Sequence, residues 1–343
     1  MKLSLKIFSL VTLLAVAIFV DAQACAPQAV IVGVINARGL PIADLPASSF
    51  RASSQGKPVS VLSASLRSDP STRTYVLLDM GVTMGGFEAQ GIDQWKIARG
   101  AAADFLNVAP PQAEIYFSTF SDAIKKTFHG KDGRQAVQDW LNGPDSMRAS
   151  ALKGWAAIHR TIIETAKAME PAHPGDSIFV ITDGRNDRRV AMASSVADEL
   201  ESRGIRLFSF MLDDSRVVDS GIAAGGLVES TPLPNPDATE LSALAKGSGG
   251  LGYTLYPGGR MIGKSFGAAY DYDDRTQQNV RSSVAEIEIA IGNFYILAIG
   301  LPGDSRGLVD FRLEVVDAQG RKRKDAIVTY PARIPGCQAG ATH

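Results

Sequence analysis

The sequence predicts an α/β fold with a doubly wound, mostly parallel sheet flanked by helices, and with accessory β segments from both termini. Short apolar segments alternate with longer segments of helical periodicity through the middle of the chain, which is typical of βαβ crossovers. Two of the apolar segments, 75–79 and 178–183, end on an aspartate that leads into a glycine-containing loop. Both flanks show alternating β patterns instead.

These changes in pattern predict four parts. Neither flank contains enough strands for a stable unit, so we expect the two flanks to pack together beside the α/β domain. The 343 residues are assigned to a signal peptide, an N-terminal β segment, an α/β domain with an irregular insertion at 213–237, and a C-terminal β segment: 1–24, 25–70, 71–292 and 293–343.

The elements follow in chain order. The alternating residues at 30–35 and 59–62 predict the N-terminal strands. The helix at 150–170 is predicted from apolar residues at helical spacing, including Trp155, which we expect to pack against the sheet. Further strands are predicted at 75–79, 114–117, 178–183, 205–212 and 253–256, and further helices at 93–107, 133–142, 191–203, 239–246 and 280–291. In the C-terminal segment, the turn at 317–320 predicts a hairpin that joins strands 309–315 and 326–330.

The N-terminus has the pattern of a secretory signal. Lys2 and Lys6 precede an apolar stretch at 7–20, and Ala22 and Ala24 supply the small residues before a cleavage site. The apolar stretch is shorter than the ~20 residues of a membrane span. We therefore expect a protein that is exported to the periplasm or the extracellular space.

The two cysteines, Cys25 and Cys337, lie at opposite ends of the exported chain. Export permits a disulfide between them. The alternative is a lipid anchor on Cys25, although Ala22 is a poor match for the bulky residue that usually precedes such a cysteine. The two interpretations exclude each other.

Asp79 and Asp183 are the candidate functional residues, because the carboxyl ends of parallel strands are where ligands bind in α/β sheets. Two carboxylates with hydroxyl groups nearby are oxygen ligands suited to a hard divalent cation. The net charge of −1 gives no basic surface and argues against nucleic acid as a partner.

The central region resembles a von Willebrand factor type A domain, and the flanks resemble the bacterial version called the VWFA-related acidobacterial domain. The flanking resemblance is carried by 34–50, 56–58, 294–297 and 331–333. The metal-ion-dependent adhesion site of this family combines a D-x-S-x-S turn, a Thr on a later loop and a final Asp. The resemblance implies that its ligands are Asp79, Thr83, Ser150 and Asp183.

The resemblance further implies Mg²⁺ or Mn²⁺ at this site and a non-enzymatic, protein-binding function in which an acidic side chain of the partner completes the coordination. Gly81 departs from the motif, because it stands where the first Ser would be. We therefore expect an incomplete site, and the alternative is a metal-free structural or assembly scaffold. Residues 120–122 resemble another loop of the family, to which we assign no metal role.

Two further motifs point to enzymes. Residues 258–265 fit the G-x-x-x-x-G-K-[ST] pattern, with Lys264 as the phosphate-binding lysine, but the acidic, glycine-interrupted sequence that follows is a poor helix start for holding phosphate. Nucleotide binding is therefore a remote alternative. Residues 263–267 match G-x-S-x-G, but only His343 follows Ser265, so a hydrolase triad is not expected.

Overall fold

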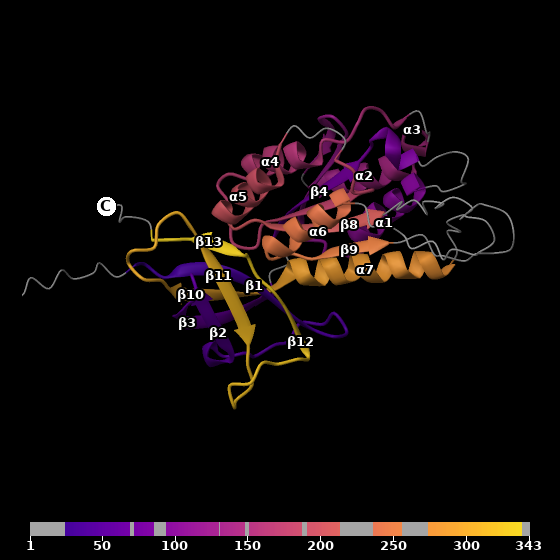
Figure 1. Ribbon diagram of the computed structural model, residues 1–343. Helices are drawn as coiled ribbons and strands as arrows, with labels where there is room; N and C mark the ends of the chain where they lie inside the picture. The colour runs from indigo at the N-terminus through magenta and orange to yellow at the C-terminus, as the bar shows by residue number, and fades with distance from the viewer. Residues whose placement is uncertain are drawn as a thin grey trace, which may run out of the picture.

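The computed structural model contains two sheets that meet at one end of an α/β unit (Figure 1). The predicted signal peptide at 1–24 and most of the predicted insertion at 213–237 lie outside the described residues. The structure describes residues 25–68, 72–85, 94–129, 131–147, 151–186, 191–212, 236–255 and 274–337.

The first sheet has the strand order β6-β5-β4-β7-β8-β9, and its strands are parallel except β6, which is antiparallel to β5. Every residue of β7 and β8 is buried, as expected for strands covered by helices on both faces. The strands are β4 (Arg73–Asp79), β5 (Glu114–Phe120), β6 (Ile124–Phe128), β7 (Ser177–Thr182), β8 (Arg206–Leu212) and β9 (Gly252–Leu255).

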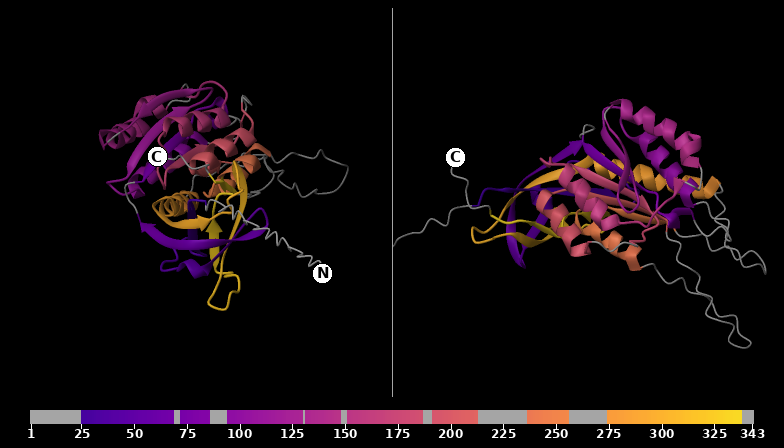
Figure 2. Two further views of the ribbon diagram at one scale, coloured as in Figure 1. Left: turned by 90° about the vertical axis from the view of Figure 1, so that its left-hand side faces the viewer. Right: turned by 90° about the horizontal axis from the view of Figure 1, so that it is seen from above.

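Helices cover both faces of this sheet (Figures 1 and 2). Successive side chains of a strand point to opposite faces, so Phe179 packs into one helical layer and Val180 into the other. The first layer contains α1 (Gln94–Val108), α2 (Lys131–Asn142) and α7 (Asp274–Gly292), and the second contains α4 (Ile158–Ala168), α5 (Ala193–Arg203) and α6 (Pro236–Gly247). The remaining short helices are η1 (Ala47–Ser49), η2 (Val82–Gly85) and α3 (Pro144–Met147).

The second sheet is antiparallel throughout and has the order β12-β1-β10-β3-β2-β11-β13. Its strands come from both flanks of the sequence. They are β1 (Gln28–Asn36), β2 (Phe50–Ser54), β3 (Lys57–Ser68), β10 (Asn293–Gly300), β11 (Leu308–Val315), β12 (Ala326–Thr329) and β13 (Arg333–Pro335). The predicted fold class, with a mostly parallel sheet and accessory β segments from both termini, is confirmed.

The α/β unit is inserted between two neighbouring strands of the second sheet. Ser68 at the end of β3 pairs with Asn293 at the start of β10, so the chain leaves and re-enters this sheet at adjacent positions. Figure 1 shows α7 running along the α/β unit and leading directly into β10.

The predicted C-terminal hairpin is only partly correct. The turn forms, since Gly320 N–H donates to the carbonyl of Asp317 at 2.9 Å and Arg323 N–H donates to that of Val315 at 2.9 Å. Beyond Arg323, however, β12 pairs with β1 rather than with β11. The side of β11 that a hairpin partner would need is taken by β13, which follows later in the chain.

The predicted helix at 150–170 is too long. α4 begins only at Ile158, and Trp155 precedes it with a 49% exposed side chain, so Trp155 does not pack against the sheet. Residues 152–157 form a loop whose backbone groups bond to other loops, and Gly154 has a φ of +79° that a helix does not allow. Helical spacing of the side chains was therefore not sufficient to make these residues helical.

A disulfide joins Cys25 to Cys337, with Cα atoms 5.4 Å apart. This confirms the first of the two interpretations of the cysteines. Disulfides are typical of proteins from oxidising compartments. No helix within the described residues has the length and apolar composition needed to cross a bilayer.

The amino end of the parallel sheet, where the two sheets meet, contains a buried ion pair. Asp176 precedes β7 and is 2% exposed. Arg73 donates from Nε to Asp176 Oδ1 at 3.0 Å and from Nη2 to Oδ2, and it also bonds the carbonyl of Met169 at 2.9 Å. The hydrogen bond that Arg73 donates to Asp176 raises the pKa of Arg73. The pair thus joins β4 to the start of β7.

Arg206 joins the same end to the second sheet. Its guanidinium donates to the carbonyls of Ala290 and Ile291, at 2.9 and 2.8 Å, in the last turn of α7, and lies 4.7 Å from the ring centroid of Phe294 in β10. Burial lowers the pKa of Arg206 to about 9, against the opposing effect of Asp176, so the side chain is charged at neutral pH.

A second contact between the sheets is made by Glu201 of α5. Arg333 of β13 places Nη2 2.6 Å from Glu201 Oε2 and 2.8 Å from Asp198 Oδ1. Burial raises the pKa of Glu201 to about 7, although Arg333 acts in the opposite direction. The α/β unit is therefore fixed to the second sheet through ionic groups at its amino end.

Candidate functional site

Asp79 and Asp183 lie side by side at the opposite, carboxyl end of the parallel sheet. Asp79 is the last residue of β4, and Asp183 directly follows the neighbouring strand β7. Both side chains are fully buried. In the register of the two strands Leu78 pairs with Ile181, which places Asp79 level with Thr182 and one residue before the level of Asp183. The sequence therefore brings two carboxylates to one edge of the sheet.

Asp79 is held by hydrogen bonds to both carboxylate oxygens. Gly81 N–H donates to Oδ1 at 2.7 Å, and the hydroxyl of Thr182 donates to Oδ2 at 2.7 Å. Thr182 Oγ1 in turn accepts from Gly184 N–H at 3.0 Å. Hydrogen bonds of this kind favour the ionised form of a carboxylic acid. Sequence reasoning missed Thr182, although a polar residue at the end of an apolar strand is a usable signal.

Asp183 is held in a similar way by its own loop. Arg185 N–H donates to Asp183 Oδ1 at 2.9 Å, and Gly184 between them has a φ of +78°. A Cβ at Gly184 would lie 2.9 Å from the Cβ of Ala238 in α6. Glycine is therefore required here both by the backbone conformation and by the close approach of α6.

The surroundings of Gly81 explain why glycine, and not the serine of the motif, stands at this position. A Cβ at this position would lie 3.0 Å from Asp79 Oδ1 and 3.4 Å from the backbone nitrogen of Ala156. A serine would therefore displace the carboxylate or the 156 backbone by a few tenths of an ångström. In place of a hydroxyl, Gly81 contributes its N–H to Asp79.

Of the two predicted hydroxyl ligands, one is described. Thr83 lies in η2, and its Oγ1 is buried without a hydrogen-bond partner in the described part of the chain. A buried hydroxyl without a partner is unfavourable and needs an explanation, such as an ion or water. Ser150 lies outside the described residues.

The donor set fits a hard divalent cation. Asp79 and Asp183 offer carboxylate oxygens and Thr83 a hydroxyl oxygen, which are ligands that Mg²⁺ and Mn²⁺ accept, with water in the remaining positions. Among the described residues, no cluster of three or more His, Cys, Asp or Glu side chains is suited to a metal. A bound cation would offer open coordination positions to an oxygen ligand of a partner.

Loops that follow different strands form one surface around the two acids. Val82 N–H donates to the carbonyl of Gly154 at 2.9 Å, and Ala157 N–H donates to that of Ser121 at 2.8 Å. These bonds join the loop after β4, the loop after β5 and the loop before α4. We refer to this surface as the carboxyl-end face (residues 79–85, 120–124, 151–157 and 183–186).

The carboxyl-end face carries exposed apolar side chains. Val82, Ile124 and Trp155 are 42%, 38% and 49% exposed. Val82 and Trp155 come from the loops after β4 and before α4, and Ile124 is the first residue of β6. Lys153 is exposed beside Trp155. Large exposed apolar side chains gathered on one face are common at protein-interaction sites.

His159 of α4 holds the residues that follow Asp183. Its Nδ1 lies 3.0 Å from Asn186 Nδ2 and 3.0 Å from the carbonyl oxygen of Ala191, and its Nε2 lies 3.2 Å from Glu240 Oε1 of α6. His159 is buried, and its hydrogen bonds to Asn186 and Ala191 could not be predicted from the helical apolar face on which it lies.

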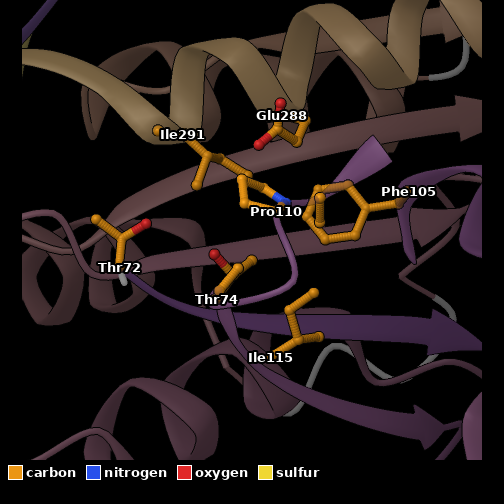
Figure 3. A pocket seen from close by; sticks show the side chains of 10 residues that line it. Thr72, Thr74, Phe105, Pro110, Ile115, Glu288 and Ile291 are labelled. Atoms are coloured by element: carbon orange, nitrogen blue, oxygen red, sulfur yellow. The ribbon is translucent and has the colours of Figure 1, made fainter. Parts of the chain in front are cut away.

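Two cavities of the described structure lie away from the two acids. A small cavity of about 20 Å³ lies between the start of β4 and α7. Figure 3 shows the side chains that line it, among them Thr72, Thr74 and Glu288. Burial raises the pKa of Glu288. This volume suits one water molecule and lies at the amino end of the sheet. A shallow groove between α1 and α7 is also remote from the acids. The phosphate-loop pattern at 258–265 lies outside the described residues.

No family model matches the sequence, and no curated protein matches it. Solved structures with a similar fold include a von Willebrand factor type A protein from Catenulispora acidiphila, at 10% identity and a TM-score of 0.43 over 91% of this chain and 74% of that one. An aerotolerance-related membrane protein from Bacteroides fragilis is 17% identical, with a TM-score of 0.42 over 62% of this chain and 98% of that one. The protein BatB from Bacteroides thetaiotaomicron is 16% identical, with a TM-score of 0.41 over 63% and 98%.

Proposed function

We propose that this chain is an exported, non-enzymatic protein-binding module that uses an incomplete metal-ion-dependent adhesion site. The ligands would be Asp79, Thr83, Ser150 and Asp183, and the ion Mg²⁺ or Mn²⁺. The observation that carries the proposal is the pair of fully buried carboxylates at the ends of β4 and β7, together with the buried hydroxyl of Thr83, which follows Asp79 in the chain. The affiliation with the VWFA-related acidobacterial domain is part of the same proposal.

The state of Asp79 favours ion binding over acid–base catalysis. Its two oxygens accept hydrogen bonds from Gly81 and Thr182 and are fully buried. Such bonds stabilise the carboxylate, whereas a general acid must hold and release a proton at the working pH. A carboxylate oxygen keeps further lone pairs, so coordination of an ion is compatible with these bonds.

The partner would contact the exposed apolar residues of the carboxyl-end face. Trp155 is the largest of them, and tryptophan is enriched among the residues that contribute most to binding energy. A carboxylate of the partner would complete the coordination of the ion, while its neighbouring side chains cover Trp155 and Val82. The disulfide agrees with an oxidising compartment and supports the proposed export.

Calorimetric titration of the protein with MgCl₂ and with MnCl₂ tests the ion site. We expect saturable heat from the wild type and at least a tenfold loss of affinity in Asp79→Asn, since a neutral amide is a much weaker ligand for a hard cation. The matched control is Asp304→Asn, which removes an exposed carboxylate from the turn between β10 and β11. Absence of heat from the wild type would end the metal-dependent proposal and leave the metal-free scaffold.

Affinity capture from the exported fraction, with and without a chelator, tests the partner. We expect one or more proteins that the wild type retains, that the chelator releases, and that Trp155→Ala fails to retain. A protein retained equally by the wild type in chelator and by Trp155→Ala would place the binding surface elsewhere on the molecule.

A further inference from the structure

Nδ1 of His159 faces two groups that make opposite demands on it. Asn186 Nδ2 and the carbonyl oxygen of Ala191 both lie 3.0 Å away. The amide nitrogen is a donor and needs an unprotonated Nδ1, whereas the carbonyl oxygen is an acceptor and needs Nδ1–H. One ring nitrogen cannot satisfy both, so the protonation state of the ring decides which bond forms.

Nε2 of His159 has a fixed role in both states. It lies 3.2 Å from Glu240 Oε1, a position that requires Nε2–H. The neutral ring therefore carries its proton on Nε2 and accepts from Asn186 at Nδ1. Adding a proton places hydrogen on Nδ1, breaks the bond from Asn186 Nδ2, and replaces it with a bond to Ala191.

The contacts of the His159 ring with α6 are the same in both protonation states, whereas its contact with the loop after β7 changes. From α6, Glu240 contacts the ring, and Asp237 Oδ2 accepts from the backbone N–H of Asn186 at 3.3 Å. From the loop, Asn186 and Ala191 compete for Nδ1. Asn186 Oδ1 is buried and has no hydrogen-bond partner within the described residues.

We propose that His159 is a proton-sensitive positioning residue for the carboxyl-end face. Protonation shifts its bond from Asn186, three residues after Asp183, to Ala191, and so changes how firmly residues 184–186 are held. The change in hydrogen bonding does not depend on the proposed function; only its effect on ligand binding rests on that function.

Two measurements on the full chain test the inference. The ¹⁵N shifts of the ring should show Nε2–H alone at high pH and hydrogen on both nitrogens at low pH. Amide hydrogen exchange, corrected for the intrinsic effect of pH, should show that protection of residues 184–186 changes along the same titration curve. The same change should be absent from His159→Gln.

The other described histidines provide the controls. His129 and His173 are exposed, and His129→Gln and His173→Gln should keep the wild-type response. Glu240→Gln, at a half-exposed position, should fold normally and move the midpoint of the response to lower pH, because it removes the charge that stabilises the protonated ring.

Several outcomes would overturn the inference. It is wrong if the exchange of 184–186 does not depend on pH in the wild type, if the dependence survives in His159→Gln, or if Glu240→Gln leaves the midpoint unchanged. Neither measurement uses a metal or a partner. A chain that binds no ion would therefore refute the proposed function and leave this result standing.

Discussion

The two ends of the parallel sheet both bury aspartates, but they surround them differently. At the amino end, Asp176 is hydrogen-bonded by the guanidinium of Arg73 and is also attracted by the positive charge of Arg206. At the carboxyl end, Asp79 accepts from a backbone amide and from the hydroxyl of Thr182. The first arrangement neutralises a charge and fixes the two sheets together. The second positions a carboxylate through two uncharged donors, a backbone amide and a hydroxyl.

Neutralising the buried aspartate at each end should give the largest difference in unfolding free energy. Asp176→Asn should cost about 3–5 kcal/mol of unfolding free energy, because it leaves Arg73 and Arg206 buried without a counter-charge. Asp79→Asn should cost less than about 1 kcal/mol, because the amide oxygen still accepts from Gly81 and Thr182 can accept from the amide NH₂. Urea denaturation followed by circular dichroism measures both. Equal costs would remove the distinction between the ends.

The amino end should also respond to pH, through Glu201. The pKa of Glu201 is raised from 4.5 to about 7 in the folded protein, so its contribution to stability is fully present below about pH 4.5 and is lost as the pH rises through 7. At pH 8, Glu201→Gln should therefore be more stable than the wild type by about 2 kcal/mol, allowing for solvent screening.

The difference between Glu201→Gln and the wild type should vanish near pH 4.5. Denaturation midpoints measured at intervals from pH 4.5 to 8 test this, with Glu164→Gln, on the exposed side of α4, as the control that should show no such trend. A parallel pH dependence in wild type and Glu201→Gln would assign the titration to another group.

The smallest effect on stability should come from the carboxyl-end face. Trp155→Ala should change the unfolding free energy by less than about 0.5 kcal/mol, as expected for an exposed side chain. Trp95→Ala, which empties a buried position of α1, should cost about 3–5 kcal/mol. Thermal or urea unfolding of the two variants checks this contrast. A large cost for Trp155→Ala would mean that this residue serves the fold and not a partner.

Sequence patterns predicted the parts of the fold that depend on local chemistry. The apolar runs ending at Asp79 and Asp183 identified two central strands, and Gly204, with a φ of +66°, ends α5 as expected of a glycine C-cap. The patterns failed where tertiary bonds override local preference. Trp155 fits a helical stripe but belongs to a loop held by bonds to other loops.

The groups that the sequence did not reveal are mostly those whose partners are distant in the chain. Arg73 and Asp176 are 103 residues apart, and His159 and Asn186 are 27 apart. Only the strand order and the helix packing bring them together. An arginine at the start of the otherwise apolar strand β8 was the one available signal for Arg206.

The pairing of Ser68 with Asn293 has a consequence for engineering. The chain leaves the second sheet and returns to it at neighbouring positions. A tight turn could therefore join β3 directly to β10 in a variant from which the whole α/β unit is deleted. The seven-stranded sheet, with its own disulfide, would then be a scaffold, and another α/β unit could be inserted between β3 and β10. The inserted unit would need its own residues to replace the contacts that Arg206 and Glu201 make with the second sheet.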